Sequence, residues 1–495
     1  MRSLCVRSGV VGLLKWTSRR SRWLLPAFHS DITLCQFSQR DFWTIRDACE
    51  GTQIFGATGS GKTSGSGRAI ATNMLAQGFG GLVLTAKPDE RDLWLRYCEE
   101  TNRSGDVVVM DDSGQARLNL LDYEFNAAAG LGLTENLVAL FTTVLESGES
   151  QSHSNDQFWQ RALRQLLRNA IDLVILATGS VGLSDLGRVV ASAARHPDEV
   201  RSADWQGSSF CCHLLRRAAN GVKSRSEEDD LRVTTEYWLG EFPAMDERTR
   251  SNIVSTFTTM ADGFQRGVLR ELFCTETTLT PEATHDGAIL IVDLPIKRYH
   301  ELGRQAQVLV KTLWQRATER RQANDSTRPV FLWADEAQYF VTKADWEFQA
   351  TARSARAATV YLTQNISSYY AAIGGPDPRS ATDSLLGNFQ TKIFHANGDA
   401  VTNEWAERLF AKSWGRRTNT TLNSQNRAQQ GSSDGSLSTG TSESLDSEVL
   451  AQAFTTLRKG GPHNKLLVDA IVFQGGRIWS GTGKNYLPVT FSQVA

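Results

Sequence analysis

A glycine-rich run that ends in lysine and threonine carries the clearest chemistry in this sequence of 495 residues. The run Gly56-Ala-Thr-Gly-Ser-Gly-Lys-Thr63 matches the pattern G-x-x-x-x-G-K-[ST] in full, between a short apolar stretch and a helix-like stretch from Ser64 to Gln77. In such a loop the backbone N–H groups surround phosphate oxygens, the lysine reaches the β- and γ-phosphates, and the threonine hydroxyl ligates Mg²⁺. The pattern therefore predicts a site for a nucleoside triphosphate. Its predicted binding residues are Gly56, Ala57, Thr58, Gly59, Ser60, Gly61, Lys62, Thr63 and Ser64.

Two adjacent acids at the end of another strand-like stretch supply what hydrolysis needs. The stretch Pro329-Val-Phe-Leu-Trp-Ala-Asp-Glu336 is apolar until its last two residues. We expect Asp335 to hold Mg²⁺ through water, beside the ligand Thr63, and Glu336 to orient and activate the attacking water. Two acids that merely end a strand are the alternative, but the buried type of strand and the glycine-rich loop favour catalysis. Lys62 and Glu336 are thus predicted catalytic residues.

A glutamine ends a third strand-like stretch, Ala358-Thr-Val-Tyr-Leu-Thr-Gln364. In a parallel sheet the tip of this strand would lie on the same edge as Asp335. We therefore include Gln364 among the catalytic residues, as a sensor of the γ-phosphate or of the attacking water. An ordinary loop residue is the alternative for this position.

Short, almost wholly apolar runs recur along the chain and are typical of strands buried on both faces of a parallel sheet. They are 53–55, 82–84, 107–110, 289–292, 330–333, 359–362 and 392–394. Helix-like stretches alternate with several of them, and this alternation predicts an α/β fold. The interval 134–273 instead shows helical periodicity, most clearly in 158–171, so we expect an all-helical insertion there.

A polar segment near the C-terminus completes the expected organisation. Residues 413–447 are mostly Ser, Thr, Gly, Gln and Asn, which bury too little apolar surface to offset the entropy of ordering, so we expect a disordered loop. The predicted domain map is a basic N-terminal leader at 1–45, a first part of the nucleotide-binding domain at 46–133, the helical insertion at 134–273, a second nucleotide-binding part at 274–412, the polar loop at 413–447, and a last nucleotide-binding part at 448–495.

The composition is that of an ordinary globular protein, with 40% hydrophobic and 22% charged residues, which excludes disordered, collagenous and disulfide-stapled classes. The 53 Lys and Arg nearly equal the 54 Asp and Glu, so no overall basic field attracts nucleic acid and any DNA contact has to be local. No stretch reaches the ~18 consecutive apolar residues of a membrane span.

The ordered set of motifs resembles that of type IV secretion coupling proteins of the TraG/TraD kind, within the FtsK/HerA superfamily of P-loop motors. The motifs are the glycine-rich loop, Leu84-Thr-Ala-Lys-Pro-Asp-Glu90, Arg117-Leu-Asn-Leu-Leu-Asp122, the acid pair with Ala337-Gln338, and Tyr361-Leu-Thr-Gln364. The resemblance implies a RecA-like P-loop NTPase core with a mainly parallel β-sheet and an inserted all-α domain. It also implies ATP and Mg²⁺ as cofactors and a homo-hexameric ring that threads DNA. Relatives often have an acid where this chain has Ala86, so we assign no catalytic role to the segment 84–90.

The function that the resemblance implies is ATP-dependent translocation of DNA, most readily single-stranded, and its delivery with bound protein to a type IV secretion channel. Relaxase and secretion-channel proteins are the implied partners. A cytosolic FtsK/HerA-like pump for duplex DNA, or a nucleotide-gated receptor for secreted protein cargo, are the alternatives. Family members usually begin with two membrane-spanning helices and none is predicted here. We therefore expect a cytoplasmic protein, with peripheral association at the inner membrane as the alternative.

The family completes each ATP site with an arginine from the neighbouring subunit, located between the acid pair and the sensor glutamine. Arg353, eleven residues before Gln364, matches that position best and is included among the catalytic residues, and Arg356 is second. A solvated helix arginine is the alternative for either position.

Overall fold

A mostly parallel sheet forms the centre of the computed structural model, which describes residues 28–127, 134–147, 156–221, 223–425 and 434–494. Within these residues, nine strands follow the order β13-β12-β9-β3-β8-β7-β4-β6-β5. All neighbours from β9 to β5 pair in parallel, whereas β12 is antiparallel to β9 and β13 is antiparallel to β12. The strands are β3 (Thr52–Phe55), β4 (Gly80–Leu84), β5 (Val107–Met110), β6 (Ile289–Val292), β7 (Val330–Ala334), β8 (Ala357–Thr363), β9 (Thr391–Phe394), β12 (Leu467–Gln474) and β13 (Tyr486–Ser492).

Helices cover both faces of this sheet, which explains why its strands are apolar throughout. Neighbouring residues of β3 belong to different hydrophobic cores, since Ile54 packs on the side of α1, α2 and α3 and Phe55 on the side of α14 to α18. A strand buried on both faces has no position for a solvated side chain. The covering helices are α1 (Ile45–Cys49), α2 (Arg68–Ala76), α3 (Glu90–Glu100), α4 (Leu120–Ala127), α14 (Ile296–Arg320), α15 (Ala344–Thr351), α16 (Ile366–Ile373), α17 (Pro378–Gly387) and α18 (Ala400–Leu409).

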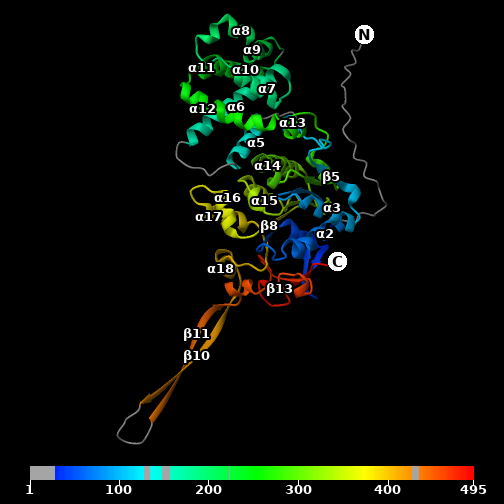
Figure 1. Cartoon of the computed structure of the whole chain (residues 1–495), viewed down its shortest axis with the longest axis vertical. Coiled ribbons are helices and arrows are strands. Elements are labelled where there is room, and N and C mark those ends of the chain that lie inside the picture. The colour runs from blue at the N-terminus through cyan, green and yellow to red at the C-terminus, as the bar shows by residue number, and fades with distance from the viewer. Residues whose placement is uncertain (1–27, 128–133, 148–155, 222, 426–433, 495) are drawn as a thin grey trace.

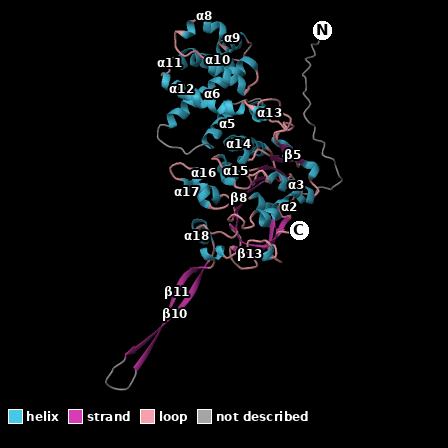
Figure 2. Ribbon diagram, in the orientation of Figure 1, coloured by secondary structure: helices cyan, strands magenta, loops and turns pink. Residues whose placement is uncertain are grey.

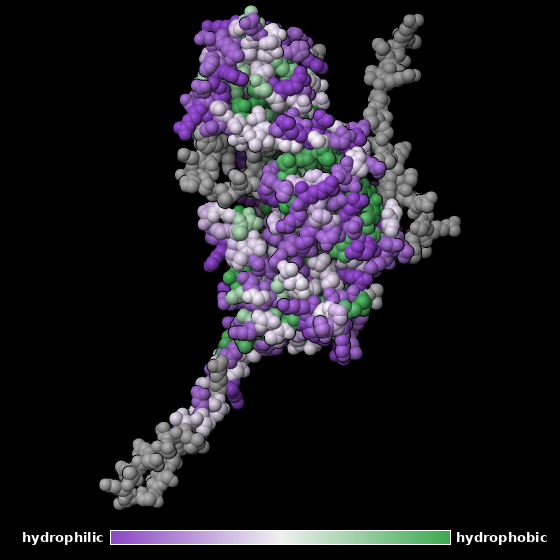
Figure 3. Space-filling model, viewed as in Figure 1, coloured by the Kyte–Doolittle hydropathy of each residue, from purple (hydrophilic) through white to green (hydrophobic). Residues whose placement is uncertain are grey.

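A helical region leaves the sheet between the edge strand β5 and its neighbour β6 and stacks at one end of the molecule (Figure 1). Its longest helix, α6, buries Leu166, Leu167, Ala170 and Ile171 completely, at the spacing expected of one helix face. The visible outer face of the region is mostly hydrophilic (Figure 3). Its helices are α5 (Thr134–Ser147), α6 (Asp156–Thr178), α7 (Leu183–Ser192), α8 (Ala203–Ser208), α9 (Phe210–Asn220), α10 (Arg225–Glu236), α11 (Phe242–Ala244), α12 (Glu247–Phe264) and α13 (Gly267–Phe273).

The predicted fold class, a mainly parallel α/β sheet with an inserted helical region, is therefore confirmed. The exact domain boundaries stay a prediction. In the described part of the chain no single helix is long and apolar enough to cross a membrane, although the bent pair Arg161–Thr178 and Leu183–Ser192 would qualify by length and composition.

The predicted N-terminal leader needs a correction for residues 28–45. These residues form the small hairpin of β1 (Thr33–Gln36) and β2 (Phe42–Thr44) and lead into α1. Trp43 is completely buried, and its Nε1 donates to Thr391 Oγ1 on β9 at 3.1 Å. Leu34, Cys35 and Trp43 are buried and pack this hairpin onto the core. Residues 1–27 of the predicted leader lie outside the described residues.

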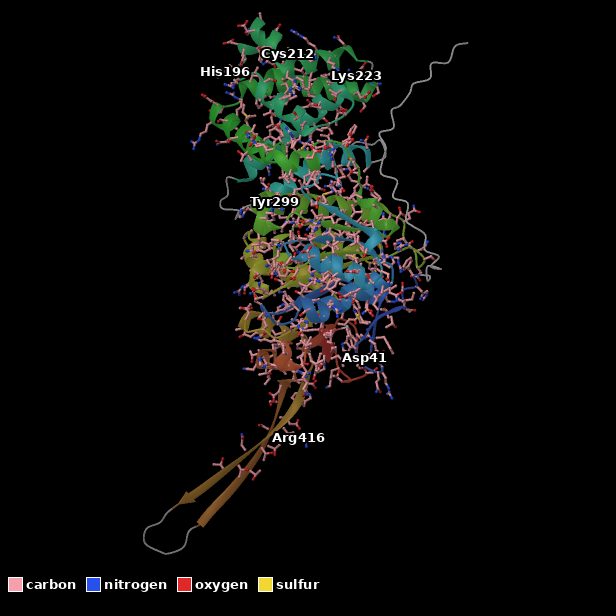
Figure 4. All side chains as sticks on the ribbon, turned by 45° about the vertical axis from the view of Figure 1, so that its right-hand side comes forward. Asp41, His196, Cys212, Lys223, Tyr299 and Arg416 are labelled. Carbon is pink, nitrogen blue, oxygen red and sulfur yellow. The ribbon has the colours of Figure 1, made fainter. Side chains whose placement is uncertain are left out.

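The prediction of a disordered loop at 413–447 is wrong for the residues described there. β10 (Lys412–Gln425) and β11 (Asp434–Ser447) pair antiparallel without a break in register and project away from the body (Figure 2). Arg416 is labelled along this ribbon in Figure 4. A core is indeed missing, since Trp414 is 72% exposed, but an antiparallel ladder satisfies backbone hydrogen bonds without one. Residues 426–433 of the predicted loop lie outside the described residues.

Shortening this hairpin tests whether it is independent of the core. Replacing 414–445 by two glycines joins the register partners Ser413 and Asp446 through a two-residue turn. The melting temperature should stay unchanged, because the strands pair with each other and leave their outer faces exposed. Differential scanning calorimetry measures this, and a loss of cooperative unfolding would show that the hairpin supports the fold.

Candidate nucleotide site

Three adjacent parallel strands bring the predicted site residues to one edge of the sheet. The order β3-β8-β7 places the loop after each strand at the same carboxyl edge. The glycine-rich loop follows β3, the acid pair Asp335-Glu336 follows β7, and Gln364 follows β8. Residues far apart in the sequence therefore meet, as the motifs predicted.

The glycine-rich loop has the backbone that phosphate binding needs. Gly59 and Gly61 have φ values of 72° and 87°, a left-handed conformation that favours glycine. The loop continues as a π-helical turn, Thr63–Gly67, into α2. The hydroxyl of Ser60 is buried and has no hydrogen-bond partner in the described structure, so the cradle keeps an unsatisfied polar group that a phosphate oxygen could pair with.

Lys62 lies between the two acids. Its Nζ is 3.6 Å from Glu336 Oε1 and 3.9 Å from Asp335 Oδ1, and all three side chains are less than a tenth exposed. The Thr63 hydroxyl donates to Asp335 Oδ2 at 2.8 Å. A hydroxyl and a carboxylate oxygen side by side are hard donors of the kind that Mg²⁺ prefers, so these residues fit the predicted metal.

Glu336 is held by donors on both carboxylate oxygens. Gln364 Nε2 donates to Oε1 at 3.1 Å and Gln338 Nε2 donates to Oε2 at 3.0 Å. Gln364 also accepts from the Thr58 hydroxyl at 3.2 Å, so it links the acid to the glycine-rich loop. Burial would raise the pKa of Glu336, but these hydrogen bonds and the nearby Lys62 hold it below its ordinary value. The residue stays a carboxylate, the form that can accept a proton from water.

Lys87 and Glu90 belong to this site although we assigned them no role from the sequence. Lys87 Nζ donates to Glu336 Oε1 at 3.3 Å, and Glu90 Oε1 lies 4.0 Å from the same nitrogen. Burial, aided by the charge of Asp335, raises the pKa of Glu90 to about 8. The sequence shows that these residues follow a strand-like run, but only the sheet order makes that strand, β4, the parallel neighbour of β7.

A fully buried network supports the turn after the acid pair. Lys311 of α14 donates to the Phe340 carbonyl oxygen at 2.6 Å and pairs with Asp345. Asp345 also accepts from Thr342 N at 2.6 Å and from the Tyr361 hydroxyl on β8 at 2.7 Å. One carboxylate thus ties α14, the turn after Glu336 and the strand before Gln364 together, while Glu336 itself keeps a φ of 54°.

Arg353 and Arg356 lie away from this site, before the start of β8 and therefore at the opposite edge of the sheet. Arg353 is 60% exposed and its NH1 is 3.0 Å from Glu50 Oε1. Arg356 is buried, where it donates to the carbonyl oxygen of Phe28 and to Asp325. Of the two side chains only that of Arg353 is exposed, whereas Arg356, the second choice, is buried in contacts with the segment before β1 and with Asp325.

Solved structures with the same fold are known. One is the unbound form of the bacterial conjugative coupling protein TrwBdeltaN70. The match covers 94% of this chain and 94% of that chain, with a TM-score of 0.54 and 11% sequence identity. For plasmid coupling protein TrwB in complex with the GTP analogue GDPNP the TM-score is 0.55 at 12% identity, over 94% and 91% of the two chains. For TrwB in complex with ADP and Mg²⁺ it is 0.52 at 13% identity, over 91% and 88%. No protein-family model and no curated protein matches the sequence.

The chain has the fold of TrwB. The predicted resemblance to type IV secretion coupling proteins is thereby confirmed at the level of the fold, and so is the RecA-like core. The TrwB fold covers the sheet, the helical region and the C-terminal strands together, because the match spans nearly the whole of both chains.

The raised pKa of Glu90 predicts how stability depends on pH. A carboxyl group whose pKa is higher in the folded protein must take up a proton on folding at any pH where it is ionised in the unfolded chain. Glu90 therefore lowers the free energy of unfolding increasingly as the pH rises from about 4.5 to 8. Glu90→Gln keeps the side-chain shape. It also keeps an oxygen that can accept from Ala86 N, as Glu90 Oε2 does at 2.7 Å. Its melting temperature should exceed that of the parent at pH 8.5, with a gain that vanishes toward pH 4.5. A gain that does not change with pH would contradict the shift.

Proposed function

We propose that this chain is an ATP-hydrolysing motor that moves DNA and acts as a coupling protein for a type IV secretion channel. The observation that carries the proposal is the contact set of Lys62, Asp335, Glu336 and Gln364 on a TrwB-like fold. Phosphate binding needs only the first of these residues. Hydrolysis also needs the two acids and the glutamine. The helical region is the part of the TrwB fold that a simple nucleotide-binding sheet lacks.

The residues divide the work of phosphoryl transfer between them. Glu336, kept ionised by its neighbours, is placed to accept a proton from the attacking water, and Gln364 orients that water through its bond to the same carboxylate. Lys62 offsets negative charge on the β- and γ-phosphates. Thr63 and Asp335 would hold Mg²⁺, which supplies further neutralisation of phosphate charge when bound.

Lys87 adds a second cation that pairs with Glu336 in this structure. Its pKa is raised above the ordinary value: burial works against the charge, but the charges of Asp335 and Glu336 outweigh it. A bound triphosphate would offer Lys87 negatively charged oxygens that compete with the carboxylate of Glu336. Lys87 would then leave Glu336 free to act on water.

A ring of identical subunits would complete the site. Arg353 is exposed at the edge opposite to its own nucleotide loop, so it can reach a nucleotide only in a neighbouring subunit. This arrangement supports a homo-hexamer with Arg353 acting in trans. Single-stranded DNA is the proposed substrate, and a relaxase and secretion-channel proteins are the proposed partners, acting in the cytoplasm or peripherally at the inner membrane.

Two substitutions separate nucleotide binding from turnover. Lys62→Ala should lose ATP binding, whereas Glu336→Gln should bind ATP as the parent does and lose turnover by about 10²-fold or more, because only the second spares the phosphate cradle. Calorimetric titration and a phosphate-release assay with single-stranded and duplex DNA measure both. Glu347→Gln, an exposed glutamate of α15, is the matched control. Equal turnover in Glu336→Gln and the parent would exclude the proposed role, and stimulation by duplex DNA alone would favour a duplex pump.

Mixing two kinds of mutant subunit tests whether Arg353 acts on the nucleotide of a neighbouring subunit. Arg353→Ala should bind ATP normally and hydrolyse it about 10³-fold more slowly, because a guanidinium at the γ-phosphate stabilises charge in the transition state. Arg353→Ala and Lys62→Ala subunits mixed in one assembly can form some complete sites, so DNA-stimulated turnover should partly recover. Glu50→Gln breaks the same ion pair but keeps Arg353, and it should stay active. No recovery in mixtures shown to co-assemble would argue against a trans arginine.

A further inference from the structure

A loop before the last two strands lies directly on the glycine-rich loop. We call residues 458–466 together with Gln493 the clasp. Gln493 joins the clasp to Ser64, which directly follows the glycine-rich loop, because its Nε2 donates to Ser64 Oγ at 2.6 Å and its Oε1 accepts from Gly461 N at 2.7 Å. A Cβ placed on Gly61 would lie 3.2 Å from the carbonyl oxygen of Lys459. The clasp therefore forms a wall against the loop that holds phosphate.

The clasp has a strained backbone that its surroundings hold in place. Four of its positions have φ between 55° and 81°, namely Gly460, Gly461, Lys465 and Leu466. This conformation is costly for a lysine and a leucine. Arg458 holds one end of the clasp, since its guanidinium donates to both carboxylate oxygens of Asp469 on β12 at 2.7 Å. Strain that neighbouring contacts maintain clusters at active sites, ligand clamps and switch regions.

The sheet order says which part of a nucleotide would meet the clasp. The γ-phosphate end is marked by Glu336 after β7, two strands from β3 on one side. The clasp precedes β12, which lies two strands from β3 on the other side. Because the nucleoside is joined to the α-phosphate, it extends away from the γ end. It therefore extends toward β12 and the clasp.

We propose that the clasp binds the nucleoside end, the ribose and base, of the triphosphate, and that Gln493 sets its distance from the glycine-rich loop. This inference rests on the proposed nucleotide-hydrolysing function and assigns the remaining wall of the same pocket. The clasp offers suitable groups, because Lys459, His463 and Lys465 are exposed there. Ammonium groups donate to ribose hydroxyls and an imidazole ring can stack on a base.

Two ligands distinguish the clasp from the phosphate cradle. Inorganic tripolyphosphate has the three phosphates of ATP but neither ribose nor base. Gln493→Ala should weaken ATP and ADP binding about tenfold in calorimetric titration, because two hydrogen bonds that position the clasp are lost. Tripolyphosphate binding should change less than about twofold, because the backbone of the glycine-rich loop and Lys62 still hold it.

The controls keep the outcome interpretable. Gln452→Ala, an exposed glutamine in the same C-terminal part, should bind every ligand as the parent does. Gln493→Asn retains the amide on a shorter side chain and should show the same selective loss, so the test does not depend on one variant. Thermal unfolding of each variant shows that it is folded. An equal loss for ATP and tripolyphosphate would overturn the proposal by showing that Gln493 acts only through Ser64, and so would no loss for either ligand.

Failure of this inference is distinguishable from failure of the proposed function. If the parent binds neither ATP nor tripolyphosphate, the nucleotide site itself is wrongly assigned. If the parent and Gln493→Ala bind ATP equally while Lys62→Ala does not bind it, the nucleotide site stands and only the clasp is wrong.

Discussion

Parallel pairing of β3, β8 and β7 is the constraint on which the rest of the site depends. Phe55 is in register with Thr363, and Ala334 is in register with Tyr361, so the three strands end at nearly the same level. Side chains that follow them share one edge although Thr63 and Asp335 are 272 positions apart in the sequence. The long helical region does not disturb this arrangement, because it enters and leaves through β5 and β6, which are neighbours at the far side of the sheet. An insertion of almost any length can start and end there without moving the nucleotide loop.

Charge balance explains how so many ionisable groups share a buried site. Lys62 and Lys87 face Asp335, Glu336 and Glu90, and a buried charge without a partner would cost several kcal/mol. With a pKa of about 8, Glu90 keeps its proton at neutral pH. Two cations then face two carboxylates, and the site is close to neutral. A bound triphosphate would add negative charge to this site, and its phosphates would then compete with the acids for the lysine side chains.

The motifs predicted much of the fold and most of the contacts of the site from sequence, and the misses have physical causes. Lys62, Asp335, Glu336 and Gln364 were predictable because each follows a strand whose apolar run is unmistakable. Lys87 was not, since its role depends on which strands are neighbours, and sequence order does not give sheet order. The hairpin at 412–447 was missed because composition reports the lack of a core but not the backbone ladder that replaces it. The clasp contacts Ser64 through Gln493, and no local pattern marks a contact between residues so far apart in the sequence.

The strand tip that carries Lys87 is also tied to α14, which connects the nucleotide edge with the helical region. The buried side chain of Gln307 accepts from Thr85 N at 2.7 Å and donates to Thr85 O at 2.8 Å, so it holds the backbone of the residue that directly follows β4. Further along the same helix, Arg316 donates to the Asn136 carbonyl oxygen of α5 at 3.0 Å. Coupling between distant sites requires an element with two discrete arrangements joined to a rigid connection. Under the proposed function Lys87 would have two such arrangements, paired with Glu336 as here or with phosphate, and α14 would be the connection. A change of partner at Lys87 would reach α14 through the neighbouring backbone of Thr85, which Gln307 holds.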